Sequence, residues 1–159
     1  RGDLPLPDRL APKTFFAALR AAAESHVQGH VVRWQCDSHT GELLCNRDTL
    51  VGAVLNLVEN ALQAAGPQAR LKVHLYSRGQ QLRLCISDNG EGIDSATLER
   101  LGEPFFTTKT TGTGLGVAVV KAVARAHQGD LLLRSRPGRG TCAILTLPLI
   151  AAAQPVTQE

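Results

Sequence analysis

Two asparagines and a glutamine form a narrow polar stripe on one predicted helix. Asn56, Asn60 and Gln63 fall within about 60° of one another when residues 48–65 are drawn at about 100° per residue. Amide oxygens one turn apart suit Mg²⁺, which takes few protein ligands and fills its shell with waters and phosphates. A solvated polar face is the alternative. However, asparagine is a mediocre helix former, and solvent faces more often carry Lys, Glu or Arg.

A carboxylate followed by two glycines forms a second candidate. Asp88 ends a predicted strand, where its side chain can point off the edge of the sheet. Gly90 and Gly92 then allow a tight backbone path beside a ligand. The Asp-Asn-Gly sequence is also an ordinary turn, so this segment is weak when taken alone.

A glycine-rich segment at the start of a predicted helix forms the third candidate. It consists of Gly112, Thr113, Gly114, Leu115 and Gly116. Backbone N–H groups at the positive end of a helix bind anions. The segment is neither a dinucleotide fingerprint nor a P-loop, because Val117 replaces the third glycine and no Gly-Lys step occurs. Lys109 adds a point charge suited to a terminal phosphate. The three candidates together provide a base acceptor, a metal-binding pair and a phosphate cradle.

The elements that must position these residues follow from hydrophobic periodicity. Residues 71–75 and 82–86 alternate in polarity as a hairpin, and 131–135 and 141–147 form a second one. Asp48 is the expected N-cap of the helix that ends at Gly66. The further elements expected are helices at 12–27, 95–101 and 115–127, and strands at 31–35 and 42–45, the last two paired with each other. This order predicts an α/β or α+β two-layer sandwich, one sheet covered on one face by helices.

Composition narrows the class of protein. The chain has 159 residues, 43% hydrophobic and 19% charged, with a net charge of +3, which fits one globular domain. It contains no methionine, which suggests a piece of a longer protein, and no run near the roughly 20 apolar residues of a membrane span. Residues 1–11 are expected to be a linker, 12–148 the domain, and 149–159 a frayed tail.

The remaining polar residues give weaker signals. Arg134, Arg136 and Arg139 are interpreted as a solvated turn rather than a nucleic-acid site, because a phosphate-binding footprint needs a larger cluster. The four cysteines, which form no Cys-x-x-Cys pair, are expected to be buried thiols in a reducing compartment. The five histidines form no zinc-ligand pattern.

Five segments, in order, resemble the motifs of sensor histidine kinases. Residues 56–61 resemble the N box, 88–92 the G1 box, 103–109 the F box and 112–116 the G2 box, while 138–141 and Leu147-Pro148 resemble the end of the domain. The resemblance covers residues 12–148 and is nearest to the nitrogen-regulation branch. It implies the Bergerat ATP-binding fold, a mixed sheet of about five strands covered on one face by three helices.

The resemblance also implies roles for individual residues. Asp88 would accept a hydrogen bond from the adenine amino group, and Asn60 would hold Mg²⁺ with Asn56 beside it. Lys109 would lie near the phosphates with Gln63. The further nucleotide-binding residues implied are Gly90, Gly92, Ile93, Phe105, Thr108, Gly112, Thr113, Gly114, Leu115, Gly116 and Thr141. Asn56, Asn60 and Lys109 are the catalytic candidates, and ATP and Mg²⁺ the expected small molecules.

One position separates kinase from ATPase chemistry in this superfamily. The ATPase relatives carry a glutamate where this chain has Asn56, and that glutamate activates water. An amide cannot accept the proton, so this site favours holding ATP for another nucleophile. Glu59, at the edge of the stripe, is interpreted as an ordinary polar residue rather than a catalytic one.

The chain departs from the family in lacking a phosphoacceptor. No histidine here is followed by an acidic residue and then a proline, as the family's acceptor histidine is. The expected partners are therefore a dimerisation domain that carries this histidine and, indirectly, a response regulator. This piece is expected to be cytoplasmic and monomeric, with no nucleic-acid or membrane contact. The alternatives are a superfamily ATPase, a serine-directed anti-sigma kinase, or a module that only senses nucleotide.

Overall fold

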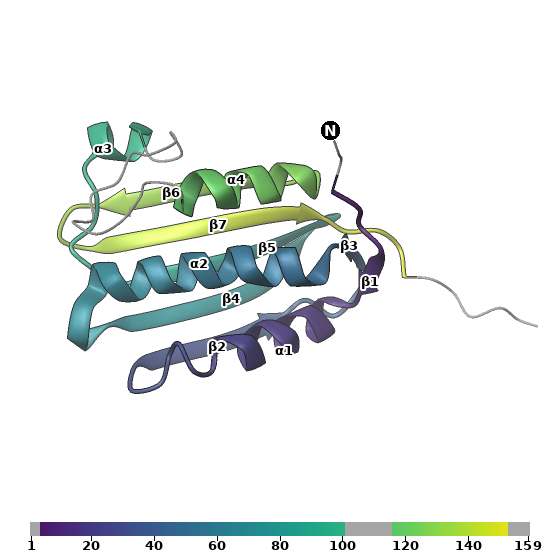
Figure 1. Ribbon diagram of the computed structural model, residues 1–159, viewed down its shortest axis with the longest axis horizontal. Coiled ribbons are helices and arrows are strands. Elements are labelled where there is room, and N and C mark those ends of the chain that lie inside the picture. The colour runs from purple at the N-terminus through teal and green to yellow at the C-terminus, as the bar shows by residue number, and fades with distance from the viewer. Residues whose placement is uncertain (1–3, 101–115, 153–159) are drawn as a thin grey trace, which may run out of the picture.

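The computed structural model describes residues 4–100 and 116–152, and its centre is a five-stranded mixed sheet (Figure 1). The strands lie in the order β2-β4-β5-β7-β6. Their bounds are Val31–Asp37 for β2, Arg70–Arg78 for β4, Gln81–Asp88 for β5, Asp130–Arg136 for β6 and Gly140–Pro148 for β7. β2 runs parallel to β4, and the other neighbours are antiparallel. The predicted mixed sheet and both predicted hairpins are confirmed.

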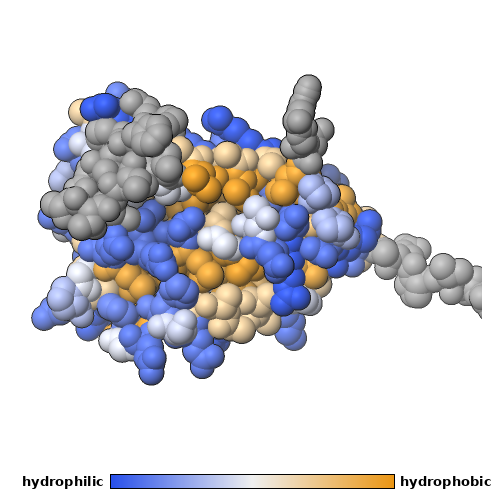
Figure 2. All heavy atoms as spheres, viewed as in Figure 1, coloured by the Kyte–Doolittle hydropathy of each residue, from blue (hydrophilic) through white to orange (hydrophobic). Residues whose placement is uncertain are grey.

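Three helices cover one face of this sheet, as predicted (Figure 1). They are α1 (Pro12–Ala23), α2 (Arg47–Ala65) and α4 (Gly116–Ala126). A short 3₁₀ helix, Gly66–Gln68, follows α2, and the short helix α3 spans Ser95–Arg100. On the helix-covered face, apolar side chains gather over α4, where Val119 is 44% exposed (Figure 2). Within the described part of the chain, no helix is long and apolar enough to cross a membrane.

The core lies between α2 and the central strands. Leu71, Val73 and Leu75 of β4 are at most 3% exposed, because alternate residues of a strand point to the same face. Leu82, Leu84 and Ile86 of β5 are buried in the same way. From α2, the predicted apolar face supplies the fully buried Leu50, Val54 and Val58. Each such side chain contributes about 1.5–3 kcal/mol on leaving water, so this contact fixes α2 over β4 and β5.

A second, two-stranded sheet corrects two predictions. Strand β3 (Leu43–Cys45) pairs antiparallel with β1 (Asp8–Leu10), not with β2, and β1 lies in the segment predicted to be a linker. Leu43 and Cys45 are fully buried in the core, so this pairing places β3 beside the helices. The Asp8 carboxylate also accepts a hydrogen bond from Arg47 N–H at 2.9 Å, tying β1 to the start of α2.

The predicted tail begins with ordered residues. Leu149 N–H donates to the Gln80 carbonyl at 2.7 Å, and Ile150 exchanges backbone hydrogen bonds with Glu42. These contacts extend the folded part beyond Leu147-Pro148, where the sequence predicted its end.

The N-terminal cap of α2 is Asn46 rather than the predicted Asp48. The Asn46 side chain accepts a hydrogen bond from Thr49 N–H at 3.3 Å. The helix starts two residues earlier than expected because β3 ends at Cys45 and the chain turns immediately. Asp48 lies in the first turn, where its negative charge interacts favourably with the positive end of the helix dipole.

A buried histidine connects α4 to the start of α2. His127, only 1% exposed, accepts a hydrogen bond from Asn46 N–H at its Nε2, 3.0 Å away. Its Nδ1 donates to the Val123 carbonyl at 2.8 Å. One nitrogen accepts and the other donates, so the ring is neutral and held in one tautomer. This ring fixes the end of α4 against the cap of α2.

Replacing this histidine should destabilise the fold. In His127→Ala, the Asn46 N–H loses its acceptor in a buried place, and a cavity forms. The unmade hydrogen bond alone costs about 1–3 kcal/mol of unfolding free energy. Urea unfolding followed by circular dichroism would measure this. The exposed His39 provides the control, since His39→Ala should change stability by no more than about 0.5 kcal/mol. Equal stability of the two variants would contradict the structural role of His127.

Candidate functional site

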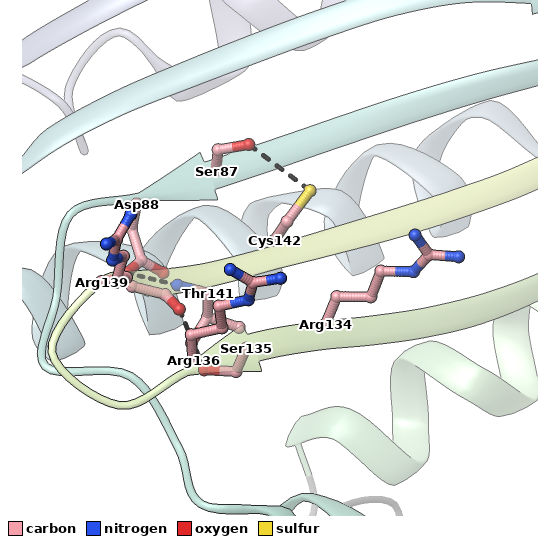
Figure 3. Close-up of a pocket in the computed structure, with 9 residues that line it drawn as sticks. Ser87, Asp88, Arg134, Ser135, Arg136, Arg139, Thr141 and Cys142 are labelled. Carbon is pink, nitrogen blue, oxygen red and sulfur yellow. Dashed lines mark hydrogen bonds between the residues drawn. The ribbon is translucent and has the colours of Figure 1, made fainter.

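Asp88 lies at the end of β5 and is held by two backbone N–H groups. Its Oδ1 accepts hydrogen bonds from Gly90 N–H at 2.8 Å and from Thr141 N–H at 3.3 Å (Figure 3). Burial raises the pKa of the Asp88 carboxyl, and the two N–H bonds oppose that rise. Both bonds go to one oxygen, so the carboxylate is fixed in orientation while Oδ2 has no hydrogen bond from the residues that the structure describes. This side chain is a positioned acceptor.

The backbone after Asp88 packs closely against its neighbours, which explains the glycines. A Cβ added at Gly90 would lie 2.9 Å from the Ala64 carbonyl oxygen of α2. Gly92 has a φ of +79°, and a Cβ there would overlap the Arg136 carbonyl. The segment therefore lies between α2 and the β6–β7 hairpin, where only glycine fits. The expectation that Gly90 and Gly92 permit a tight path agrees with this geometry.

Two hydroxyl side chains complete this wall of the site. The Ser135 hydroxyl accepts a hydrogen bond from Ile93 N–H at 2.7 Å and donates one to the Gly140 carbonyl at 3.0 Å. Thr141 Oγ1 lies 2.8 Å from the same hydroxyl. The network thus joins the segment after Asp88 to both strands of the hairpin. Thr141 was predicted from the sequence, whereas Ser135 was not.

A signal for Ser135 does exist in the sequence. Leu131, Leu133 and Ser135 occupy alternate positions of β6 and therefore share one face. A hydroxyl that continues an apolar row toward the core needs a partner, because an unpaired buried polar group is costly.

Asn89, which lies between Asp88 and Gly90, has a structural role. Its side-chain oxygen accepts a hydrogen bond from Arg70 N–H at 2.8 Å, and its amide nitrogen donates to the Gln68 carbonyl at 3.2 Å. These bonds hold the start of β4 against the end of β5. The residue after Asp88 therefore orients the turn.

The amide stripe of α2 faces the start of α4. Asn60 is half-buried, and a Cβ added at Gly116 would lie 3.6 Å from its Nδ2. Asn56 is also half-buried, whereas Gln63 is exposed. Ala64, one turn after Asn60, contacts Gly90 through its carbonyl. The last turn of α2 thus lies against the turn after Asp88, and Asn60, one turn earlier, lies beside Gly116.

Glu59 has a partner outside the stripe. Its Oε1 lies 2.7 Å from His26 Nδ1, beyond the end of α1. Both side chains are partly exposed, at 45% and 34%, so the contact is a surface pair worth little in stability.

The third candidate cannot be placed. Seven predicted nucleotide-binding residues lie outside the described residues: Phe105, Thr108, Lys109, Gly112, Thr113, Gly114 and Leu115. Of the G2 segment only Gly116, the first residue of α4, has a position.

The donors available for a metal are amide oxygens. Within residues 4–100 and 116–152, no three His, Cys, Asp or Glu side chains gather into a metal site. A site built from Asn60 and its neighbour Asn56 offers few protein ligands, which fits a cation that keeps waters and phosphate oxygens, as Mg²⁺ does.

Comparison with known proteins identifies relatives. The family model for the histidine kinase-, DNA gyrase B- and HSP90-like ATPases matches residues 45–151. Sensor protein kinase FleS of Pseudomonas aeruginosa is 77% identical over 153 residues, which cover 96% of this chain and 38% of that protein. The signal transduction histidine-protein kinase AtoS of Escherichia coli is 38% identical over 117 residues, 72% of this chain and 19% of that protein. The chain therefore spans well under half the length of these curated relatives.

Solved structures show the same fold. The catalytic domain of histidine kinase ThkA superposes with a TM-score of 0.79 at 23% identity, covering 90% of this chain and 95% of that one. Full-length ShkA in complex with AMPPNP gives 0.80 at 24% identity, covering 98% of this chain and 34% of that one.

The half-buried carboxyl group of Asp88 leads to a prediction about stability. Because its pKa is raised above 3.8 in the folded state, the folded protein binds a proton there more tightly than the unfolded chain does. The protonated Asp88 therefore contributes to the free energy of unfolding at low pH, and this contribution is lost as the pH rises through the raised pKa. Asp88→Asn keeps an oxygen acceptor without the charge, so this variant should gain stability relative to the parent between acidic and neutral pH.

Asp94 provides a control of opposite sign. Its pKa is lowered, mainly by the hydrogen bond from Thr97 N–H, so its charge stabilises the folded state above the ordinary pKa. Asp94→Asn should therefore lose stability relative to the parent over the same range. Denaturant midpoints at several pH values measure both trends, and the same sign for the two variants would contradict the assignment.

Proposed function

Because this chain belongs to the family of histidine kinase-, DNA gyrase B- and HSP90-like ATPases, we propose that it is the ATP-binding catalytic domain of a two-component sensor histidine kinase. In this role it binds Mg·ATP and presents the γ-phosphoryl group to a histidine on a dimerisation domain. The similarity to sensor kinases FleS and AtoS supports the kinase branch of the family.

The fixed carboxylate of Asp88 is the observation that carries this proposal. With Oδ1 engaged by Gly90 and Thr141, Oδ2 can accept from the exocyclic amino group of adenine. The low polarity that raises its pKa also strengthens a hydrogen bond to the charged form. Adenine fits this site because its amino group can donate a hydrogen bond to the carboxylate. A base with a carbonyl in place of that amino group would set two acceptors against each other.

The phosphates would extend from Asp88 along the amide stripe. Asn60 would contribute its side-chain oxygen to Mg²⁺, with Asn56 beside it and Gln63 toward the phosphates. An ion held there would reduce the negative charge of the phosphate oxygens. Lys109 and the 112–116 segment would supply the remaining cation and N–H donors. The position of Gly116 supports this arrangement, because Gly116 is the last residue of the 112–116 segment and lies beside Asn60.

The side chain of Asn56 favours transfer over hydrolysis. An amide has no lone pair basic enough to take a proton from water, so no general base stands at that position. The attacking group would then be a histidine nitrogen, which would form a bond to the γ-phosphorus while the bond from that phosphorus to the bridging oxygen breaks and ADP leaves. Three of the five histidines suit that role poorly: His127 is buried, His26 Nδ1 lies 2.7 Å from Glu59 Oε1, and His74 Nε2 lies 2.7 Å from Asp37 Oδ2. The acceptor would come from another domain of the longer protein.

Removing the Asp88 carboxylate should weaken ATP binding. A charge-assisted hydrogen bond is worth about 1.5–3 kcal/mol, or roughly tenfold to a hundredfold in affinity. Isothermal calorimetry of Asp88→Ala with Mg·ATP measures this. Asp94→Ala is the matched control, since that exposed carboxylate lies in the following turn and should leave affinity unchanged. Unchanged affinity in Asp88→Ala would refute the adenine assignment.

Phosphotransfer can be tested by supplying the missing acceptor. The chain mixed with Mg·ATP and a dimerisation domain from a related kinase should yield acid-labile phosphohistidine on that domain and none on itself. Asn60→Ala should reduce the yield at least tenfold, as expected for loss of a group that positions the phosphates. Steady ATP hydrolysis by the chain alone, abolished in Asn56→Ala, would instead indicate an ATPase. Binding without any transfer would indicate a nucleotide-sensing module.

A further inference from the structure

The face of the sheet opposite α1, α2 and α4 carries a row of polar side chains across all five strands. The register places Arg33, Lys72, Ser87, Cys142 and Arg134 side by side, one from each strand. They alternate with buried residues such as Leu71 and Val73, so they point away from the helices. The three cations are exposed, and the row contains no carboxylate. Ser87 and Cys142, at the centre of this row, therefore have positively charged side chains on both sides.

Cys142 lies in a pocket within this row. The pocket has a volume of about 270 Å³, and Cys142 and Ser87 line it together with Arg134, Arg136, Arg139 and Asp88 (Figure 3). All three arginines are exposed, so their guanidinium groups are available to a ligand. The arginines are solvated, as the sequence predicted, and they line the same pocket as the Cys142 thiol.

Three groups stabilise the Cys142 sulfur as a thiolate. The Cys85 thiol lies within hydrogen-bonding reach, and the Ser87 hydroxyl donates to the sulfur at 3.4 Å. The positive charge of Arg134 acts in the same direction. Together they outweigh the effects of burial and of Asp88, and they lower the pKa of Cys142 to about 6, while the pKa of Cys85 is raised. The lowered pKa favours the thiolate, which is the nucleophilic form, at Cys142 rather than at Cys85.

The register disfavours an internal disulfide. Cys85 pairs with Ile144, so Cys142 is its diagonal neighbour two residues along β7. Diagonal neighbours lie about 7–8 Å apart, whereas disulfides need Cα atoms within about 4.4–6.8 Å. The Cys85 thiol therefore lies near the Cys142 sulfur without being placed to bridge it, and its Sγ is also 3.8 Å from the Tyr76 hydroxyl.

We propose that Cys142 is a site of thiol–disulfide exchange with a small anionic disulfide of the glutathione class. The Cys142 thiolate attacks one sulfur of the disulfide, the bond between the two ligand sulfurs breaks, and the released thiolate takes a proton from solvent. The protein keeps one half of the ligand as a mixed disulfide. Arg134, Arg136 and Arg139 bind the ligand's carboxylates during the attack, because guanidinium groups match carboxylates in geometry and charge.

Oxidised glutathione is the probe that tests this site. The chain is incubated with it at neutral pH, and intact mass and peptide mapping follow the adduct. We expect one adduct, on Cys142, that dithiothreitol removes and that Cys142→Ser abolishes. Cys36→Ser is the matched control, since Cys36 is a half-buried strand cysteine on the helix-covered side and its loss should leave the adduct unchanged.

A neutral probe separates charge recognition from simple thiol reactivity. Oxidised glutathione should react roughly tenfold faster than 2-hydroxyethyl disulfide, in line with electrostatic attraction at a charged cleft. The double variant Arg134→Gln/Arg139→Gln should lose that preference while it still reacts with the neutral compound. The proposal is overturned if the adduct forms equally on Cys36, if a Cys85–Cys142 disulfide forms instead, or if the parent shows no preference for the anionic probe.

Discussion

The close approach of the 88–93 segment to the β6–β7 hairpin is the contact on which the rest of the site depends. Gly140 has a φ of +111°, and a Cβ there would overlap the Asp88 carbonyl, just as one at Gly92 would overlap Arg136. Because backbone meets backbone at both places, Thr141 N–H reaches the Asp88 carboxylate and Ser135 reaches Ile93 N–H. Side chains at either glycine would separate these groups, so the polar site and the glycines are one feature.

The helix layer adds a second constraint, on the spacing of α2 and α4. His127 and Asn46 join one pair of helix ends through a buried hydrogen bond, and Asn60 meets Gly116 near the other end of α4. A shift of α4 would therefore break a buried bond at one end and move the amide stripe relative to the glycine segment at the other. Packing in the core and geometry in the site are coupled through this helix.

Hydrophobic patterns predicted the parts of the fold that local periodicity determines. The alternation in β4 and β5 and the apolar face of α2 place Leu71, Leu84 and Val58 in the core without knowledge of any partner. Pairing over long distances is different: a three-residue strand such as β3 has too few residues to show a period, and its partner β1 is more than 30 residues away in sequence. Similarly, Asn46 and Asp48 are both good caps, and only the end of β3 decides between them. Within the site, Asp88 and Thr141 followed from motifs. The alternation along β6 indicates that Ser135 needs a hydrogen-bond partner, but it does not identify Ile93 N–H as that partner.

Consecutive residues at the start of β7 point to opposite faces of the sheet, and the groups that they meet on the two faces differ. Thr141 points toward Asp88, and the next residue, Cys142, points to the open face between Ser87 and Arg134. On that face Arg33 stands directly opposite Lys72, a cross-strand pair of like charges that is unfavourable by itself. Solvent screens that repulsion because both side chains are exposed, whereas the half-buried Cys142 sulfur experiences the field of Arg134 with less screening. Of the cations in this row, Arg134 alone acts on the Cys142 thiol, and its effect is smaller than the effects of the Cys85 thiol and the Ser87 hydroxyl.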